Sequence, residues 1–341
     1  MMSSIRVGIV FLLLSQAQFS LSADESCPSD GDVQFVCGLE NPEDLILVPD
    51  SNWVIASTAV SSSLDEGALI AVNTVDFRLV ELVPHRSFDS NSDFSLSTSS
   101  SADCPGPRAA NFQPHGISLL TGASKVHTLF VVGHGEREAI EVFELSTQSE
   151  LPRLTWLGCI VAPSEVTRFN AVTYLPNGGI AATNFAPPEG EVWEWHRSKG
   201  WSEVPGSKMI APNGVVASDD GKWLFIADWI GRAIIRLSRE QEPPVIDRIS
   251  VGFRVDNLRW ARDGSILATG QTVNCESQSG CEFVGTRTIK VNPESLDWQL
   301  LFEYADSEFF RMGTVAIEVE YELWLGGLRD GQGIARVLQA E

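Results

Sequence analysis

The chain of 341 residues carries 45 acidic and 24 basic side chains, which gives a formal net charge of −21 at neutral pH. Such a charge repels nucleic acids and anionic membranes at long range, so the composition argues against both as partners, while it favours solubility and tolerates a bound cation. The length fits either two average domains or one large closed β-architecture.

The N-terminal residues predict export. Arg6 precedes an apolar run at 7–14, and small residues that suit a cleavage site follow at Ser20, Ser22 and Ala23. This pattern is typical of a secretory signal peptide, predicted here at 1–23. The apolar run is shorter than the roughly 20 residues that cross a bilayer, and no later segment approaches that length. We therefore expect a secreted chain without a membrane span.

The cysteines indicate disulfides rather than a metal site. Six cysteines in an exported chain predict disulfide pairs, and the sequence leaves their connectivity open. Cys27 with Cys37 and Cys275 with Cys281 are the locally plausible pairs. Neither pair has the spacing of zinc ligands, so a structural zinc site is not expected.

One pattern repeats six times along the rest of the chain: a polar residue, an apolar strand, a Gly/Asp/Asn turn, then a second and a third apolar strand. Repeats of about 40 to 50 residues built from short strands are typical of propeller blades. The sequence therefore predicts an all-β protein whose residues 24–341 form one six-bladed β-propeller around a central metal channel, with the Ser-rich segment 87–101 as an exposed insertion. The six copies, in chain order, are EDLILVPDSNWVIAS with ALIAVN, HGISLL with HTLFVVGHG and AIEVFEL, NAVTYLPNGGIAATNF with EVWEW, NGVVASDDGKWLFIADWIGRAIIRL, DNLRWARDGSILATG with TRTIKVN, and TVAIEVEYELWLGG with IARVL.

The leading polar residues of the copies are candidates for a shared site. The innermost strand of each blade lines the channel, so residues that begin these strands converge at one mouth although they are far apart in sequence. Carboxylate and amide oxygens in this number suit calcium, which accepts six to eight oxygen ligands. Asn and Asp are also common at strand starts because they cap turns, but their coincidence at one repeat phase favours a ligand role. The leading residues are Glu43, His115, Asn170, Asn213, Asp256 with Asn257, and Thr314.

Four motifs resemble those of the paraoxonase/arylesterase family, six-bladed calcium propellers related more distantly to the gluconolactonases. They are PHGIS (114–118), VVGHG (131–135), PNGVVASDDGKWLFIAD (212–228) and VDN (255–257). The resemblance runs in the same order from about residue 40 to residue 335, which covers nearly all of the chain after the signal peptide.

The resemblance implies a calcium ion that polarises the carbonyl of a lactone or ester. The implied ligands match Glu43, Asn170, Asn213, Asp256 and Asn257. The histidine that matches His115 is implied as the general base that activates water, and the one that matches His134 orients it and passes its proton outward. Asp256 is an alternative base, and a turn residue among glycines is an alternative reading of His134. We interpret the other histidines, His85, His127 and His196, as structural.

The sequence departs from the family in two places. The family's second, structural calcium uses an aspartate where this chain has Ala171, so Asp44 and the carbonyl of Ile117 would be its remaining ligands and the second ion is doubtful. The family also joins a cysteine corresponding roughly to Cys37 to one near the C-terminus, which this chain lacks. The ring must therefore close differently, and strand pairing alone is one way.

Other catalytic signatures are absent from the sequence: it has no GxSxG, no HExxH and no P-loop. We expect a calcium-dependent lactonase or arylesterase that acts on a small-molecule lactone or ester. A gluconolactonase-type sugar-lactone hydrolase and a non-catalytic, metal-stabilised binding propeller are the alternatives. The sequence leaves the substrate and the oligomeric state open, and Trp229 is a candidate for the wall of the substrate pocket.

Overall fold

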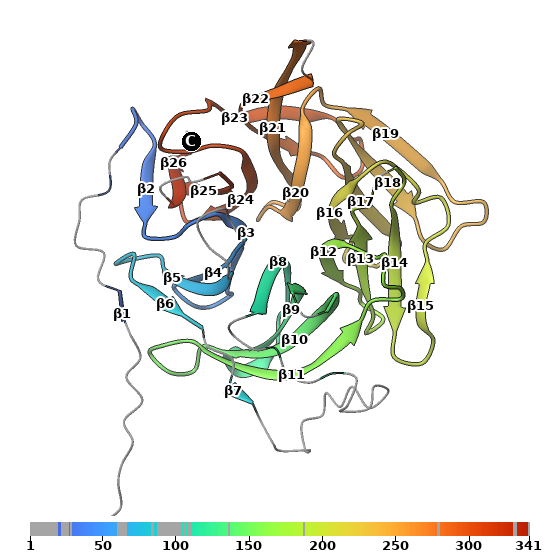
Figure 1. Ribbon diagram of the computed structural model, residues 1–341, viewed down its shortest axis with the longest axis horizontal. Coiled ribbons are helices and arrows are strands. Elements are labelled where there is room, and N and C mark those ends of the chain that lie inside the picture. The colour runs from blue at the N-terminus through green and yellow to red at the C-terminus, as the bar shows by residue number, and fades with distance from the viewer. Residues whose placement is uncertain are drawn as a thin grey trace, which may run out of the picture.

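Six antiparallel-rich sheets stand around a central axis in the computed structural model, which confirms the predicted six-bladed β-propeller (Figure 1). The structure describes residues 20–21, 27, 29–59, 67–82, 85–86, 104, 107, 111–135, 137–186, 188–277, 280–329 and 333–339. Most of the predicted signal peptide, 1–23, and the Ser-rich segment 87–101 lie outside these ranges. Within them the one helical element is a short 3₁₀ turn, η2 (Ala123–Lys125). None of the described helical structure is long and apolar enough to cross a bilayer.

The first three blades follow the first three sequence repeats, each with its inner strand nearest the axis. The first blade contains, from the axis outward, β3 (Pro42–Leu47), β4 (Trp53–Thr58), β5 (Ala68–Asn73), β6 (Leu79–Glu81) and β1 (Ser20–Leu21). The second contains β8 (Phe112–Leu120), β9 (Val126–Gly135), β10 (Ala139–Ser146), β11 (Arg153–Val161) and β7 (His85–Arg86). The third contains β12 (Phe169–Tyr174), β13 (Ile180–Asn184), β14 (Glu191–His196) and β15 (Gly200–Glu203).

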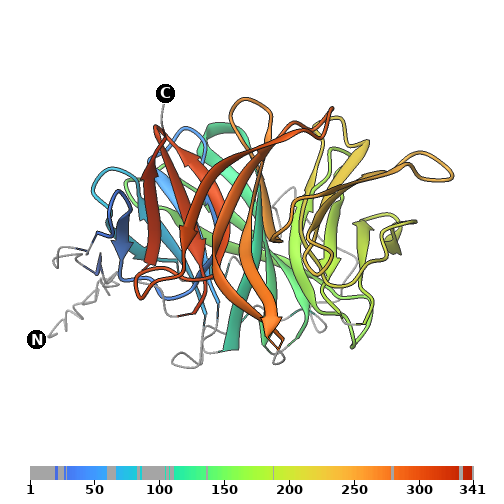
Figure 2. The ribbon, with the colours of Figure 1, turned by 90° about the horizontal axis from the view of Figure 1, so that it is seen from above.

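The last three blades are four-stranded. The fourth contains β16 (Pro212–Ala217), β17 (Trp223–Asp228), β18 (Ala233–Ser238) and β19 (Ile246–Ser250). The fifth contains β20 (Arg254–Trp260), β21 (Ile266–Ser277), β22 (Gly280–Val291) and β23 (Trp298–Ala305). The sixth contains β24 (Gly313–Val319), β25 (Glu322–Gly327), β26 (Gly333–Leu338) and β2 (Gln34–Cys37). Seen from the side, the strands run across the short dimension of the disc (Figure 2).

Strand pairing closes the ring, as the missing C-terminal cysteine predicts. β2 comes from the N-terminal part of the chain and pairs antiparallel with β26, from Gln34 opposite Arg336 to Cys37 opposite Gly333. The N-terminal strand β2 and the C-terminal strand β26 therefore belong to the same sheet. Separating them would break the hydrogen bonds of the sixth blade and open the ring.

The core is divided into layers between neighbouring blades. Ile55 of the first blade packs in one cluster with Val131 of the second, and Ile140 of the second packs in another with Phe169 of the third. Four further clusters fill the remaining four interfaces of the ring. A single blade cannot bury both of its faces, so the β-branched strands that look alike in sequence are stabilised only when the ring is complete.

None of the three disulfides involves an inner strand. Cys27–Cys37 and Cys275–Cys281 confirm the two local pairs expected from the sequence. The third bond, Cys104–Cys159, ties the segment before β8 to β11 across 55 residues of sequence.

Candidate active site

Each inner strand loses register with its neighbour at the predicted leading residue. Such bulges re-aim side chains and end regular pairing, and here they turn one polar side chain of every blade toward the axis at the same mouth. The shifts fall between Pro42 and Asp44, Pro114 and Ile117, Phe169 and Val172, Pro212 and Val215, Val255 and Leu258, and Gly313 and Val315.

Glycines beside two of these residues let neighbouring inner strands approach closely. A Cβ at Gly116 would lie 2.4 Å from the carbonyl oxygen of Asn170, and one at Gly214 would lie 2.6 Å from that of Asp256. Both distances are shorter than any real Cβ contact. The HG of PHGIS and the NG of PNGVV are therefore requirements of strand packing next to the site.

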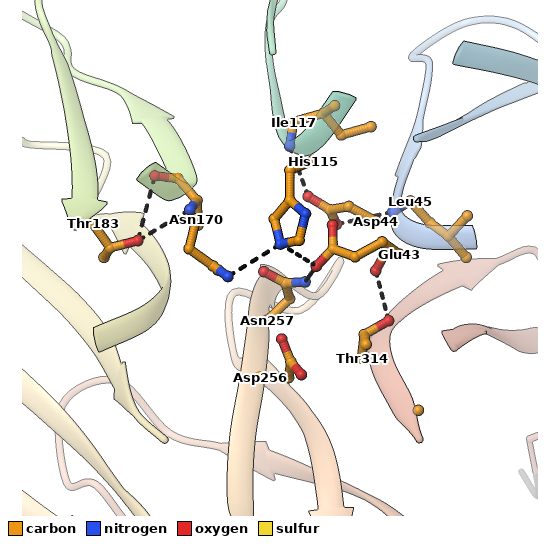
Figure 3. Close-up of polar contacts among 12 residues, drawn as sticks. Glu43, Asp44, Leu45, His115, Ile117, Asn170, Thr183, Asp256, Asn257 and Thr314 are labelled. Atoms are coloured by element: carbon orange, nitrogen blue, oxygen red, sulfur yellow. Dashed lines mark hydrogen bonds and ion pairs between the residues drawn. The ribbon is translucent and has the colours of Figure 1, made fainter. Parts of the chain in front are cut away.

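His115 lies at the centre of the converging side chains (Figure 3). The amide of Asn170 donates to its Nε2 at 3.1 Å, and Oε1 of Glu43 lies 3.6 Å from the same atom. Because a side-chain amide nitrogen can only donate, Nε2 of His115 is the acceptor and its ring proton is on Nδ1. The amide of Asn257 donates to Oε1 of Glu43 at 2.9 Å. The ring nitrogen of His115 that faces the polar cluster is therefore the unprotonated one.

Four oxygens around this histidine are buried and have no hydrogen-bond partner among the described residues. Orphaned buried acceptors cost free energy, so their clustering fits a site built for a cation with oxygen ligands. No group of three or more His, Cys, Asp or Glu side chains with metal-binding geometry occurs in the described ranges, because three of the donors here are amides. The orphaned atoms are Oε2 of Glu43 and Oδ1 of Asn170, Asn213 and Asn257.

The carboxylates of the cluster, those of Glu43 and Asp256, are buried away from solvent. Burial, and then the charges of Asp44 and Asp256, raise the pKa of Glu43 well above its ordinary value. Burial raises the pKa of Asp256 to about 7, although hydrogen bonds from Gln271 and Asn213 oppose the shift. Burial, and then the charge of His134, lower the pKa of His115 to about 3, so its imidazole is neutral at pH 7. The hydrogen bond from Asn257 and the charge of Arg259 oppose the shift in the pKa of Glu43 without cancelling it.

His134 has a partner that the sequence reasoning missed. The rings of His115 and His134 lie edge to face with centroids 5.4 Å apart. On its far side, Nδ1 of His134 lies 2.9 Å from Oε2 of Glu138, whose other oxygen accepts from the backbone N–H of Phe169 at 2.6 Å. A cavity of about 650 Å³, lined also by Arg137 and Arg168, opens beside this pair. Nothing in HGEREA distinguishes Glu138 from an ordinary surface carboxylate before the fold is known.

The donors of the doubtful second calcium do not fit a metal ion, because an arginine already uses them. The guanidinium of Arg259 contacts the carboxylate of Asp44 and donates to the carbonyls of Leu45 and Ile117, at 3.1 and 3.0 Å. Asp44 also accepts from the backbone N–H of Ile117 at 2.8 Å. Ala171 is buried in the core between the third and fourth blades and offers no oxygen from its side chain. A charge in the strand DNLRW is the one sequence signal that pointed to Arg259.

Gln271 is the second missed residue at the mouth. Its amide donates to Oδ2 of Asp256 at 2.6 Å and to the carbonyl of Gly313 at 2.9 Å, while its Oε1 accepts from the indole of Trp229 at 2.8 Å. Trp229, the candidate pocket wall, is therefore one side chain away from the carboxylate cluster. The remaining described histidine side chains point elsewhere: His127 accepts from the backbone N–H of Gly122, and His196 bonds to Ser198.

Comparison with known proteins finds a similar sequence among the paraoxonases. Serum paraoxonase/arylesterase 1 of Mus musculus is 29% identical over 140 residues, which cover 37% of this chain and 38% of that protein. The resemblance to the paraoxonase/arylesterase family is confirmed. No family model matches the chain. Since the match spans less than half the length of this paraoxonase, its activity passes to the present chain only as a proposal.

Two solved structures share the fold of this paraoxonase-like chain. A gluconolactonase from Xanthomonas campestris aligns with a TM-score of 0.53 and 12% identity, covering 96% of this chain and 99% of its own. A luciferin-regenerating enzyme aligns with a TM-score of 0.54 and 11% identity, covering 90% of this chain and 94% of its own. At such low identity these likenesses establish the propeller and its blade count, and the chemistry must be argued from the site.

Proposed function

We propose that the protein is a secreted, calcium-dependent hydrolase of lactones or aryl esters. The observation that carries the proposal is the ring of four orphaned buried oxygens next to the unprotonated nitrogen of His115. The fold and the paraoxonase match support a lactonase-type propeller. Three disulfides and the N-terminal signal pattern support an extracellular site of action.

The side chains that would hold the ion are Glu43, Asn170, Asn213, Asp256 and Asn257. Two carboxylates and three amide oxygens match the preference of calcium, and two negative charges leave a divalent ion nearly neutral. When bound, calcium supplies Lewis acidity toward a carbonyl oxygen and stabilises the negative charge that develops on it. A hydrogen bond joins Glu43 of the first blade to Asn257 of the fifth blade across the channel. It holds the two side chains so that the orphaned oxygen of each is available to the ion.

His115 moves the proton. Its Nε2 takes a proton from water as the water oxygen bonds to the carbonyl carbon; the C–O bond to the leaving alcohol then breaks, and the alkoxide takes the proton back. The products are one carboxylic acid and one alcohol, joined in a single molecule when the substrate is a lactone. His134 packs against His115 and is fixed by Glu138, so the second histidine has a defined orientation. Asp256 is the alternative base, but as one of the proposed calcium ligands it would have its oxygens occupied by the ion.

Hydrolysis of a substrate panel tests the proposal. The panel contains aliphatic lactones, a sugar lactone and phenyl acetate, each measured with calcium, with a chelator, and after calcium is restored. We expect activity that chelation abolishes and calcium recovers. Turnover of the sugar lactone alone would move the assignment to the gluconolactonase type. No turnover by a folded, calcium-loaded sample would leave a binding propeller.

A further inference from the structure

Three arginines lie at the channel mouth of this strongly acidic protein. Arg232 is in the turn between β17 and β18, Arg254 begins β20, and Arg329 follows β25. These positions belong to three consecutive blades of the ring. The strand registers place them at the mouth that carries the candidate ligands, because the end of β17 pairs with the start of β16 and the end of β25 pairs with the start of β24. Among the described residues none of the three has an ion-pair partner, whereas Arg236 and Arg248 on the same fourth blade pair with Asp247 and Asp228.

Two of these arginines form a column with aromatic rings. The guanidinium of Arg254 lies 4.1 Å from the ring centre of Trp229 and 5.3 Å from that of Phe283, and that of Arg329 lies 5.0 Å from Phe283. Stacking satisfies the flat faces of a guanidinium and leaves its N–H edges free for an anion. Nε of Arg254 is buried and has no hydrogen-bond partner among the described residues. The aromatic rings therefore hold the two guanidinium groups in place, while Nε of Arg254 still lacks a hydrogen-bond partner among the described residues.

The cluster is unfavourable without a counter-charge. Nη2 of Arg232 donates to Sγ of Cys275 at 2.7 Å, so the partner that the described residues give it is a neutral disulfide and not a carboxylate. Asp306 is near enough for the charge of Arg329 to lower its pKa, though this is the weakest of the causes that act on it. Arg232 and Arg329 also have left-handed backbones, with φ of 52° and 65°, where glycine or asparagine is less strained. Like charges and strained backbones kept together at one mouth are typical of a binding site.

The column stands directly beside the candidate metal ligands. Trp229 donates to Gln271, and Gln271 donates to Asp256, so one side chain separates the aromatic face from the carboxylate cluster. Phe185 packs against the same indole with ring centres 5.7 Å apart. A small molecule whose carbonyl lies at the cluster would place its remaining atoms along this aromatic and cationic wall.

We infer that the wall formed by Trp229, Phe283, Arg232, Arg254 and Arg329 binds an anionic group of the substrate, and that the substrate class is a lactone or ester bearing a carboxylate on an apolar body. This inference rests on the proposed hydrolase function, which makes the bound molecule a substrate. The carboxylate accepts hydrogen bonds from the free edges of Arg254 and Arg329, and the apolar body lies against the rings. The net charge of −21 repels anions at long range, but salt screens this field beyond about 8 Å, within which the arginines dominate.

A matched pair of substrates tests the inference kinetically. The pair is 4-acetoxybenzoate and its neutral methyl ester, compared by kcat/KM for release of the phenol. We expect the anion to be preferred by about tenfold or more, as one charge-assisted hydrogen bond provides, and the preference to weaken at high ionic strength. Arg254→Met should remove the preference and Arg254→Lys restore part of it. Arg236→Met is the control, because Arg236 also stacks on a tryptophan, 4.9 Å from the ring centre of Trp223, but already has Asp247 as its ion-pair partner.

A binding experiment separates this inference from the proposed function. Calorimetry compares 4-phenylbutyrate with 4-phenylbutanol, neither of which can be hydrolysed. Binding of the acid, lost in Arg254→Met and kept in Arg236→Met, supports the anion site even if no ester is turned over, in which case only the hydrolase proposal fails. Equal hydrolysis of both esters, with no binding of the acid, would overturn the anion site and leave the hydrolase proposal intact.

Discussion

Arg259 pairs with Asp44, a carboxylate that is 1% exposed, and through the carbonyls of Leu45 and Ile117 it ties β20 to β3 and β8. The arginine is itself only 12% exposed and belongs to a different blade from either partner strand. It supplies a fixed positive charge inside the channel, where the family resemblance would have placed a second metal ion. Burial still raises the pKa of Asp44, and Arg259 is the first cause that opposes this shift.

Removing Arg259 should destabilise the protein strongly. Arg259→Met leaves the buried carboxylate of Asp44 without its counter-charge, and loss of one partner of a buried pair costs about 3 to 5 kcal/mol. Urea unfolding measures the change. Arg262→Met, which removes an arginine that is 59% exposed and leaves Glu318 paired with Lys290, should cost about 1 kcal/mol or less. The double variant Asp44→Asn with Arg259→Met should recover part of the loss; equal costs for the two single arginine variants would contradict the assignment.

The protein should bind about one calcium ion per chain. The four orphaned oxygens form one site, and the donors near Asp44 are already used by Arg259. Metal analysis after removal of free calcium, together with calorimetric titration of the stripped protein, measures the stoichiometry. Glu43→Gln should weaken binding because it removes one of two ligand charges. Two tightly held ions in the wild-type protein would show that the arginine does not replace a cation.

His115 and Asp256 should differ in what their loss abolishes. His115→Gln is expected to lower kcat by about 10²- to 10⁴-fold, the usual contribution of a general base, while calcium remains bound. Asp256→Asn should weaken calcium binding as well as activity. Parallel measurement of kcat and calcium affinity separates the two roles. His196→Gln, at a half-buried histidine bonded to Ser198 away from the channel mouth, is the control. Full activity in His115→Gln would transfer the base role to Asp256.

Glu138 should act by orienting His134. Glu138→Gln keeps an oxygen for the N–H of Phe169 but can present a donor, instead of a carboxylate, to Nδ1 of His134. We expect kcat to fall by about tenfold or more, as loss of a charged hydrogen bond implies, with little change in KM or in unfolding temperature. Glu165→Gln, in the lining of the same cavity, is the control. A fall in unfolding temperature with kcat unchanged would mean that Glu138 only joins two blades.

The calcium-free protein should lose stability as the pH rises from 6.5 to about 8. Folding raises the pKa of Asp256 to about 7, so the folded state binds this proton more tightly than the unfolded chain, and the advantage is lost as pH passes that value. His115 opposes this only below its ordinary pKa of 6.5, because folding lowers its value to about 3. Urea unfolding of the chelated protein should show a slope smaller than the limit of roughly 1.4 kcal/mol per pH unit for one proton, and the slope should fade toward pH 8 as Asp256 becomes fully ionised.

Two comparisons check the origin of this slope. Asp256→Asn should flatten it, since the titrating carboxyl is gone. Saturating calcium should reverse it, because the ion binds the deprotonated carboxylates and stabilises the folded state by mass action. A chelated wild-type protein whose stability rises over this pH range would contradict the buried, uncompensated state of the two carboxylates.

The sequence by itself determined the architecture and the position within each repeat at which the candidate site residues lie. Alternation of short apolar strands with Gly and Asp turns is a local property, and six copies of it require six blades. The leading residues Glu43, His115, Asn170, Asn213 and Asp256 were found because a repeat places equivalent positions at equivalent points of the ring. The local disulfides followed from short spacing in the same way.

Only the tertiary structure decided which partners these residues have. Arg259 reaches Leu45 across 214 residues, and Trp229 reaches Gln271 across 42. Such contacts depend on how neighbouring blades are rotated and on the bulge at the start of each inner strand, neither of which leaves a periodic signal in the chain. The pairing of Arg259 with Asp44, the bond from Phe169 that holds Glu138 beside His134, and the arginine wall beside Trp229 are therefore consequences of ring closure, which brings groups from separate repeats into contact.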